Sequence, residues 1–122
     1  MIIPDTSVWI EFLKGNEPYF SQLKELLERN EVMGVECIFG ELLQGAKNSR
    51  ERYSIESYWK YLPKSDEHGF WIEAGRYSGE LKLSSRGIGL IDAVLLIASR
   101  TTKARLWTLD KKLRSVLENE ES

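Results

Sequence analysis

Acidic side chains are the residues of this sequence whose types and positions could support chemistry. The acids of interest each border an apolar run: Asp5 ends "MIIP", Glu41 lies within "ECIFGELLQGA", Asp92 opens "LIDAVLLIAS" and Asp110 follows "RLWTL". A carboxylate in such a place can bind a metal ion or cap the N-terminus of a helix. The other residues of the chain must therefore discriminate between a chemical and a structural interpretation.

The remaining composition excludes several common kinds of catalytic site. His68 is the only histidine and Cys37 the only cysteine, which excludes two-histidine acid–base catalysis, multi-histidine or cysteine zinc sites and an internal disulfide. There is no G-x-S-x-G motif and no P-loop, and "GIGLID" is not a G-x-G-x-x-G motif because Asp92 occupies the third glycine position. If the chain is an enzyme, carboxylates are the groups that remain.

Length and charge predict one soluble domain. With 122 residues, of which 42% are hydrophobic, the chain can bury a core as a single domain spanning residues 1–122. A formal charge of -2 provides no global basic field, so a polyanion would have to bind to local patches. No run approaches the roughly 20 apolar residues of a membrane span, the N-terminus has no basic leader, and a lone cysteine suits a reducing compartment. We expect a cytoplasmic protein.

Short apolar runs alternate with amphipathic stretches along the chain. The pattern predicts strands near 1–4, 31–35, 62–65 and 105–109, and helices near 8–15, 18–30, 36–46, 49–62, 66–87, 90–99 and 110–120. Strands that alternate with helices favour a parallel sheet covered on both faces. The expected fold class is therefore α/β, a three-layer α/β/α domain with a central parallel sheet.

This architecture could bring the acids together. Asp5 closes the first expected strand and Asp110 the last, so both would lie at the carboxyl edge of the sheet if the two strands are neighbours. Asp92 opens a helix whose N-terminal dipole tolerates a carboxylate. Glu41 lies on the helix after the second strand and could point at the same edge.

A cluster of carboxylates requires neutralisation. Two carboxylates about 4 Å apart repel by roughly 4 kcal/mol at an effective dielectric near 20. Oxygen ligands select Mg²⁺ or Mn²⁺ over zinc or copper. Such an ion can orient a water molecule and stabilise charge on a phosphodiester, so the pattern suits metal-assisted hydrolysis of nucleic acid.

The same residues carry a family resemblance. The segments "MIIPDTSVWIEFLKG", "ELLQGA", "RGIGLIDAVLLIAS" and "LWTLD" resemble, in order and spacing, the motifs of the PIN-domain ribonucleases, and most of all the VapC toxins of toxin–antitoxin pairs. The resemblance covers essentially the whole chain. It implies that Asp5, Glu41, Asp92 and Asp110 form the catalytic acidic cluster, with Asp5 and Asp92 as metal ligands and Ser7 and Thr108 as supporting residues.

The resemblance also implies an activity and partners. A protein of this kind would be a Mg²⁺- or Mn²⁺-dependent endoribonuclease, usually dimeric, whose cognate VapB-like antitoxin covers the active-site groove with its C-terminal segment. One departure concerns Lys112, which stands where many relatives carry a further Asp. We therefore expect one well-bound ion, with any other arriving with the RNA.

Each acid taken alone has a structural explanation. Asp92 could be a first-turn or cap residue, Asp5 part of a "DTS" turn, Glu41 a solvated helical residue and Asp110 an N-cap. Basic residues after two of the acids, Lys47, Arg50 and Arg52 after Glu41 and Lys111, Lys112 and Arg114 after Asp110, could contact RNA phosphates or simply form solvated faces. Only the joint pattern of the acids favours catalysis.

Other functions of different classes remain open at this stage. A phosphoryl-accepting receiver domain has a similar length but needs paired acids after the first strand and an acceptor aspartate in mid-chain, whereas this chain has only Asp5, followed by Thr6 and Ser7. An aspartyl phosphatase needs D-x-D, and Ser7 replaces the second Asp. A catalytically silent binding module, with the acids serving as caps, is the main alternative.

Overall fold

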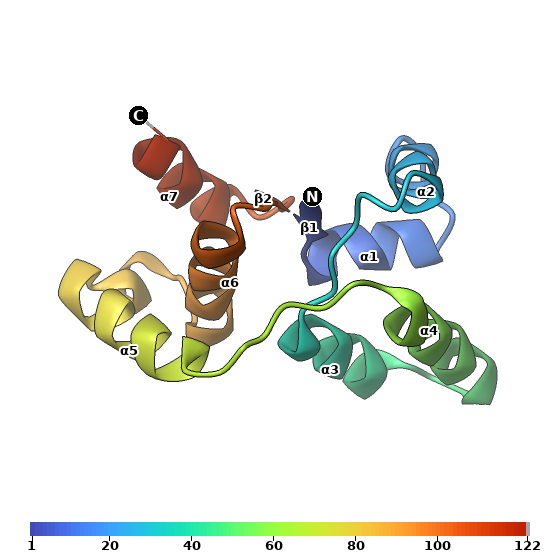
Figure 1. Cartoon of the computed structure of the whole chain (residues 1–122), viewed down its shortest axis with the longest axis horizontal. Helices are drawn as coiled ribbons and strands as arrows, with labels where there is room; N and C mark the ends of the chain where they lie inside the picture. Colours follow the sequence, from blue (N-terminus) through green and yellow to red (C-terminus); the bar gives the residue numbers. More distant parts are fainter. Residues whose placement is uncertain (122) are drawn as a thin grey trace.

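The computed structural model describes residues 1–121, with side chains described through Asn119. Its elements, in chain order, are β1 (Ile2–Pro4), α1 (Thr6–Leu13), α2 (Tyr19–Glu28), α3 (Glu36–Gly45), α4 (Ser49–Tyr61), α5 (Phe70–Leu81), the 3-10 helix η1 (Leu83–Arg86), α6 (Leu90–Thr102), β2 (Arg105–Trp107) and α7 (Lys111–Glu121). Figure 1 shows their arrangement. The sequence pattern predicted most of these elements to within a few residues.

The sheet is parallel, as predicted, and β1 lies within it. On one side β1 pairs with β2, with Ile3 opposite Leu106. On the other side Ile2 forms a parallel bridge with Val32, and further along Gly34 bridges Lys64. The predicted strands at 31–35 and 62–65 therefore contribute isolated bridges, two from the first segment and one from the second, and not full strands.

The helices cover the sheet in two layers. In Figure 1, α5, α6 and α7 lie on one side of β1 and β2, and α1 to α4 lie on the other. The chain passes from β1 through α1 and α2 to Val32, and returns through α5 and α6 to β2 on the opposite flank of β1. The three-layer α/β/α prediction is confirmed.

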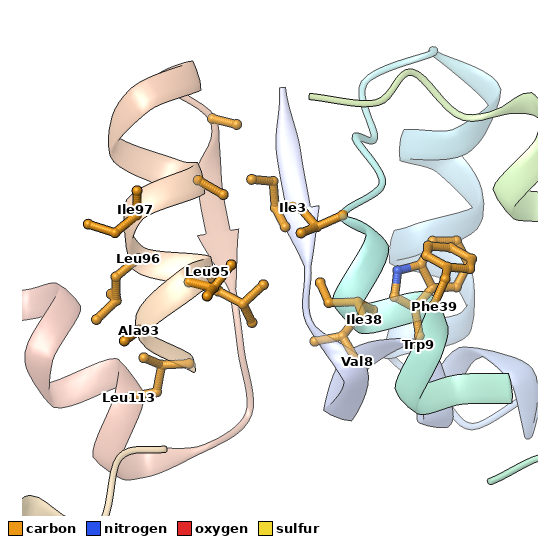
Figure 2. Close-up of a cluster of buried hydrophobic side chains, with 14 of the residues drawn as sticks. Ile3, Val8, Trp9, Ile38, Phe39, Ala93, Leu95, Leu96, Ile97 and Leu113 are labelled. Carbon is orange, nitrogen blue, oxygen red and sulfur yellow. The ribbon is translucent and has the colours of Figure 1, made fainter. Parts of the chain in front are cut away.

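The core forms where both helical layers meet the sheet. Ile3 is fully buried between side chains of the two layers, which include Val8, Ile38 and Leu95 (Figure 2). The apolar run at 93–98 in α6 is buried throughout, because this helix packs against both the sheet and α5. No helix within residues 1–121 is long and apolar enough to cross a bilayer.

The prediction of one long helix over residues 66–87 is wrong. The helix begins only at Phe70, after Gly69 in a left-handed conformation, and ends at Leu81. Lys82 then adopts a left-handed backbone, with φ of 54°, and η1 follows. The break carries Leu83 into the core, where it is fully buried, whereas Leu81 remains 44% exposed. Burial of Leu83 overrides the local preference for a continuous helix.

Candidate active site

The strand ends place two of the acids at one edge of the sheet. Asp5 directly follows β1, and its backbone N–H donates to the carbonyl of Trp107, the last residue of β2. Asp110 follows β2 by three residues, so it does not close the strand itself as the sequence analysis expected. The chain leaves β1 toward one flank and reaches β2 on the other, so this edge is a switch point of strand order, where parallel α/β sheets bind ligands.

Asp5 is a buried carboxylate with structural partners. It is 5% exposed and forms the N-cap of α1, where its Oδ1 accepts hydrogen bonds from the Val8 N–H at 3.3 Å and from the Ser7 hydroxyl. Asp5 and Thr108 are the buried polar side chains among the side chains described. Both lie at this edge of the sheet, where burial of a polar group requires compensating hydrogen bonds.

Ser7 and Thr108 hold the turn that leads to Asp110. The Ser7 hydroxyl also accepts a hydrogen bond from the N–H of Leu109 at 3.1 Å, and Thr108 Oγ1 accepts from the N–H of Asp110 at 3.0 Å. Ser7 thus joins Asp5 to a segment about a hundred residues away in the chain. The supporting positions that the family resemblance implied are therefore in contact with the predicted site.

Asp110 caps the helix that it precedes. Its Oδ1 accepts hydrogen bonds from the N–H groups of Lys112 at 2.8 Å and Leu113 at 3.1 Å, both in the first turn of α7. The structural interpretation of Asp110 as an N-cap is thus correct. Capping engages one carboxylate oxygen, and because the residue is exposed, the other oxygen can still contact a ligand.

Glu41 is held by a residue whose role the sequence analysis missed. The Thr6 hydroxyl donates a hydrogen bond of 2.7 Å to Glu41 Oε1 and so joins α1 to α3. Asp5, and not Thr6 or Ser7, is the N-cap of α1. Both hydroxyls are therefore free to bond elsewhere. The "DTS" triplet, with small polar residues beside an acid, was the signal available for this arrangement.

Asp92 is the acid without a structural partner. It is half-buried in the first turn of α6, whose N-cap is Gly89 with no side-chain capping bond. Within residues 1–121 no hydrogen bond or ion pair engages its carboxylate. Partial burial first, and then the charges of Asp110, Asp5 and Glu41, raise the pKa of Asp92 to about 6. The fold therefore brings all of the predicted acids into electrostatic range of Asp92.

The donor set suits a divalent cation that is bound by few protein ligands and several water molecules. No group of three or more His, Cys, Asp or Glu residues in the described part of the chain is arranged tightly enough to form a metal-binding cage. Mg²⁺, however, characteristically binds through one or two carboxylates and completes its shell with water and substrate oxygens. The donors are all oxygens, and Asp92 offers an uncompensated carboxylate to the ion. The site therefore suits an ion held by two carboxylates.

The acids at this edge differ in exposure. Asp5 is buried, Glu41 and Asp92 are half-buried, and Asp110 is exposed. Two hollows of about 290 and 460 Å³, the first beside Tyr58 and Leu62 and the second beside Gly75 and Gly79, are lined by none of these acids. A ligand from solvent can therefore reach Asp110 directly and the half-buried acids in part.

A comparison with known protein families gives a match over nearly the whole chain. A family model described as the PIN domain matches residues 2–118. The chain belongs to the PIN domain family. The match spans both strands and every element that carries one of the acids, so the resemblance based on the sequence motifs is confirmed.

Two individual proteins that are similar to this PIN domain chain have a more specific name. Ribonuclease VapC32 of Mycobacterium tuberculosis, from strain CDC 1551 / Oshkosh and from strain ATCC 25618 / H37Rv, is in each case 32% identical over 118 residues. The aligned region covers 94% of this chain and 89% of the relative. The similarity therefore extends over nearly the whole of both proteins.

Proposed function

We propose that this PIN domain chain is a Mg²⁺- or Mn²⁺-dependent endoribonuclease and the toxin of a VapBC-type toxin–antitoxin pair. The observation that carries the proposal is the electrostatic convergence of Asp5, Glu41 and Asp110 on Asp92. Four acids held near one another cost stability and serve no packing purpose that requires all of them. Similarity to proteins named ribonuclease supports RNA as the substrate.

Asp5 and Asp92 would hold the metal ion. A bound ion would supply a polarised water molecule and a positive charge for the phosphodiester. Asp5 is preorganised for this task because Ser7 and the start of α1 fix its carboxylate. Asp92, which lacks such bonds, would gain its principal partner from the ion, and its negative charge would then be compensated.

Glu41 and Asp110 would act at the rim of the site. Thr6 engages Glu41 Oε1, which leaves Oε2 to accept a hydrogen bond from a water molecule and to take its proton during attack. Asp110 uses Oδ1 as a helix cap and keeps Oδ2 for the hydration shell of the ion. Ser7 and Thr108 would fix the relative positions of Asp5 and Asp110.

Partners follow from the family resemblance. We propose RNA as the substrate, a VapB-like antitoxin as the inhibitor, and a homodimer or a toxin–antitoxin hetero-oligomer as the assembly. The exposure of Asp110 at this edge of the sheet supports this proposal, because both a polymer and an inhibitory peptide need accessible groups. Copurification of the chain with the small protein encoded immediately upstream, if a reading frame exists there, would test the antitoxin.

The central experiment is cleavage of a defined RNA with controlled metal ions. We expect cleavage with Mg²⁺ or Mn²⁺ and none in excess EDTA, and we expect Asp5→Asn and Asp92→Asn to abolish it. Asparagine caps helices as well as aspartate does, so Asp5→Asn should keep its fold by circular dichroism. Glu56→Gln, which removes an exposed carboxylate on α4, is the control and should cleave normally.

Two results would overturn the proposal. One is undiminished cleavage in EDTA or in both asparagine variants, because the carboxylates would then not be involved. The other is the absence of divalent-ion binding in calorimetry at millimolar concentration, which would favour a catalytically silent binding module whose acids serve as caps.

A further inference from the structure

Positive charge collects on one side of the acidic site. We call Arg86, Lys111, Lys112 and Arg114 the cationic flank. All four side chains are exposed, and three of them lie in the first turns of α7, directly after Asp110. None of the four forms an ion pair with a carboxylate among the side chains described. Their charge is therefore available to a ligand.

Lys112 reaches from α7 to the chain segment that precedes α6. Its side chain lies across Gly87, with Nζ only 2.8 Å and Cδ 3.0 Å from the position that a Cβ on Gly87 would occupy. Gly87 also has a φ of 79°, so both conformation and space favour glycine there. Gly89, two residues later, begins the helix of Asp92. The ammonium group therefore lies beside the starts of the helices associated with Asp92 and Asp110.

Arg114 is fixed near the same place. Its Nη2 donates a hydrogen bond of 2.8 Å to the carbonyl of Thr108, the residue that also binds the N–H of Asp110. The guanidinium thus belongs to the turn that holds the acidic edge. Because a guanidinium has five N–H donors, one bond to a carbonyl leaves others for phosphate oxygens.

Acidic residues lie at the start of α3, across β1 from the cationic flank. In Figure 1, α7 and α3 lie on opposite sides of β1. Glu67 Oε2 accepts a hydrogen bond from the N–H of Glu36, and the Glu36 carboxylate is within electrostatic range of Glu67. Partial burial and, more weakly, the charge of Glu36 raise the pKa of Glu67. A polyanion would be repelled from this side and attracted to the cationic flank.

We propose that the RNA backbone binds along the cationic flank, where Lys112 contacts a phosphate next to the one that is cleaved. This proposal rests on the proposed nuclease function and adds the direction from which the substrate enters. It also assigns Lys112 a role of its own. A carboxylate at this position would ligate metal, whereas the ammonium would hold substrate. A protein of formal charge -2 needs such a local patch to bind RNA.

The test is binding of a fluorescent, cleavage-resistant RNA, a 2′-O-methyl phosphorothioate oligonucleotide, measured by anisotropy in Mg²⁺ over a series of KCl concentrations. We expect Lys112→Gln to weaken binding on the order of tenfold, and to reduce the slope of log K against log salt by about 0.7, the value for one lost phosphate contact on a single strand. Lys112→Arg should retain both. Lys24→Gln, the same substitution at an exposed lysine on α2, is the matched control.

Each outcome decides the proposal. Equal binding by Lys112→Gln and Lys24→Gln overturns it. If both variants bind normally, Lys112 makes no contact with RNA. If both bind weakly, the change in net charge alone explains the loss. Failure of the nuclease proposal is separate, since binding in this assay requires no cleavage. If the protein does not cleave RNA, but Lys112→Gln weakens RNA binding and the control does not, the cationic flank is supported and the nuclease proposal fails. Thermal melting of each variant verifies its fold.

Discussion

Thr6 and Glu41, which lie 35 residues apart in the chain, form a hydrogen bond of 2.7 Å between Oγ1 and Oε1. The bond exists because Asp5 caps α1 and leaves the Thr6 hydroxyl free. The bond orients the Glu41 carboxylate, which belongs to α3, from a side chain of α1. Thr6 is therefore a positioning residue for Glu41.

We predict that Thr6→Val lowers catalytic activity on the order of tenfold, because a hydrogen bond to a charged group contributes about 1.5 kcal/mol. The loss should fall on kcat rather than on KM, since Glu41 is proposed to accept a proton and not to bind substrate. Steady-state cleavage kinetics measure both constants.

Thr6→Ser keeps the hydroxyl and should retain most of the activity. Thr101→Val is the control: it removes an exposed hydroxyl near the C-terminus of α6, at the end away from Asp92, and should have no effect. If Thr6→Ser is as impaired as Thr6→Val, the hydroxyl is not sufficient to maintain activity, and the positioning role is wrong.

Asp92 predicts a pH dependence of stability in the metal-free protein. Its pKa is 3.8 in the reference state and about 6 in the fold, so between these values the unfolded chain releases a proton that the native state retains. Stability from this group is present below about pH 4 and is lost as the pH rises through 6. Asp92→Asn should therefore stabilise the metal-free protein at pH 7.5, by about 1 kcal/mol because solvent screens a half-exposed carboxylate, and should add nothing at pH 3.5.

Urea unfolding in EDTA at the two pH values measures this difference, with Glu56→Gln as the control for loss of an exposed carboxylate outside the cluster. Mg²⁺ should raise the melting temperature of the native sequence and not that of Asp92→Asn. A destabilised Asp92→Asn at pH 7.5 would mean that the carboxylate has a stabilising partner and that the acids do not repel one another.

The hydrogen bonds of Ser7 predict that its replacement lowers stability and activity together. Ser7→Ala removes one bond to Asp5 and leaves the Leu109 N–H without its acceptor, so we expect a cost of about 1–2 kcal/mol and a fall in cleavage rate. Ser57→Ala removes a hydroxyl that bonds only within α4, where alanine is a better helix former. That variant should be as stable as the native sequence and fully active. Equal behaviour of the two variants would contradict the link between β1 and β2.

The break after α5 can be tested without reference to function. Lys82 adopts a left-handed conformation, which costs a non-glycine residue about 1 kcal/mol. Lys82→Gly should therefore be neutral or should stabilise the fold by up to about 1 kcal/mol. Lys24→Gly in the middle of α2 should destabilise by about 1 kcal/mol. If both variants lose the same stability in urea unfolding, residue 82 lies within a continuous helix.

The residue pattern was more informative about which acids lie at one edge of the sheet than about where the helices on either side of Lys82 end and begin. Asp5 and Asp110 could be assigned to one edge because neighbouring parallel strands must end together. The break at Lys82 could not be predicted, since lysine has no preference for a left-handed backbone, and the local signal favoured helix. The decisive contact was burial of Leu83 by distant segments.

The sequence by itself determined which acids could meet, because strand ends and helix starts are local consequences of apolar periodicity and of residues such as "DTS". The caps made by Asp5 and Asp110 are also local, because each carboxylate accepts from an N–H two or three residues further on. Only the tertiary structure decided the rest: it gave Glu41 a hydrogen bond from Thr6, joined Ser7 to the Leu109 N–H, and left Asp92 among the charges of the other acids without a hydrogen bond. These differences arise from contacts between segments that are far apart in the chain, and no local pattern encodes the distance between two such side chains.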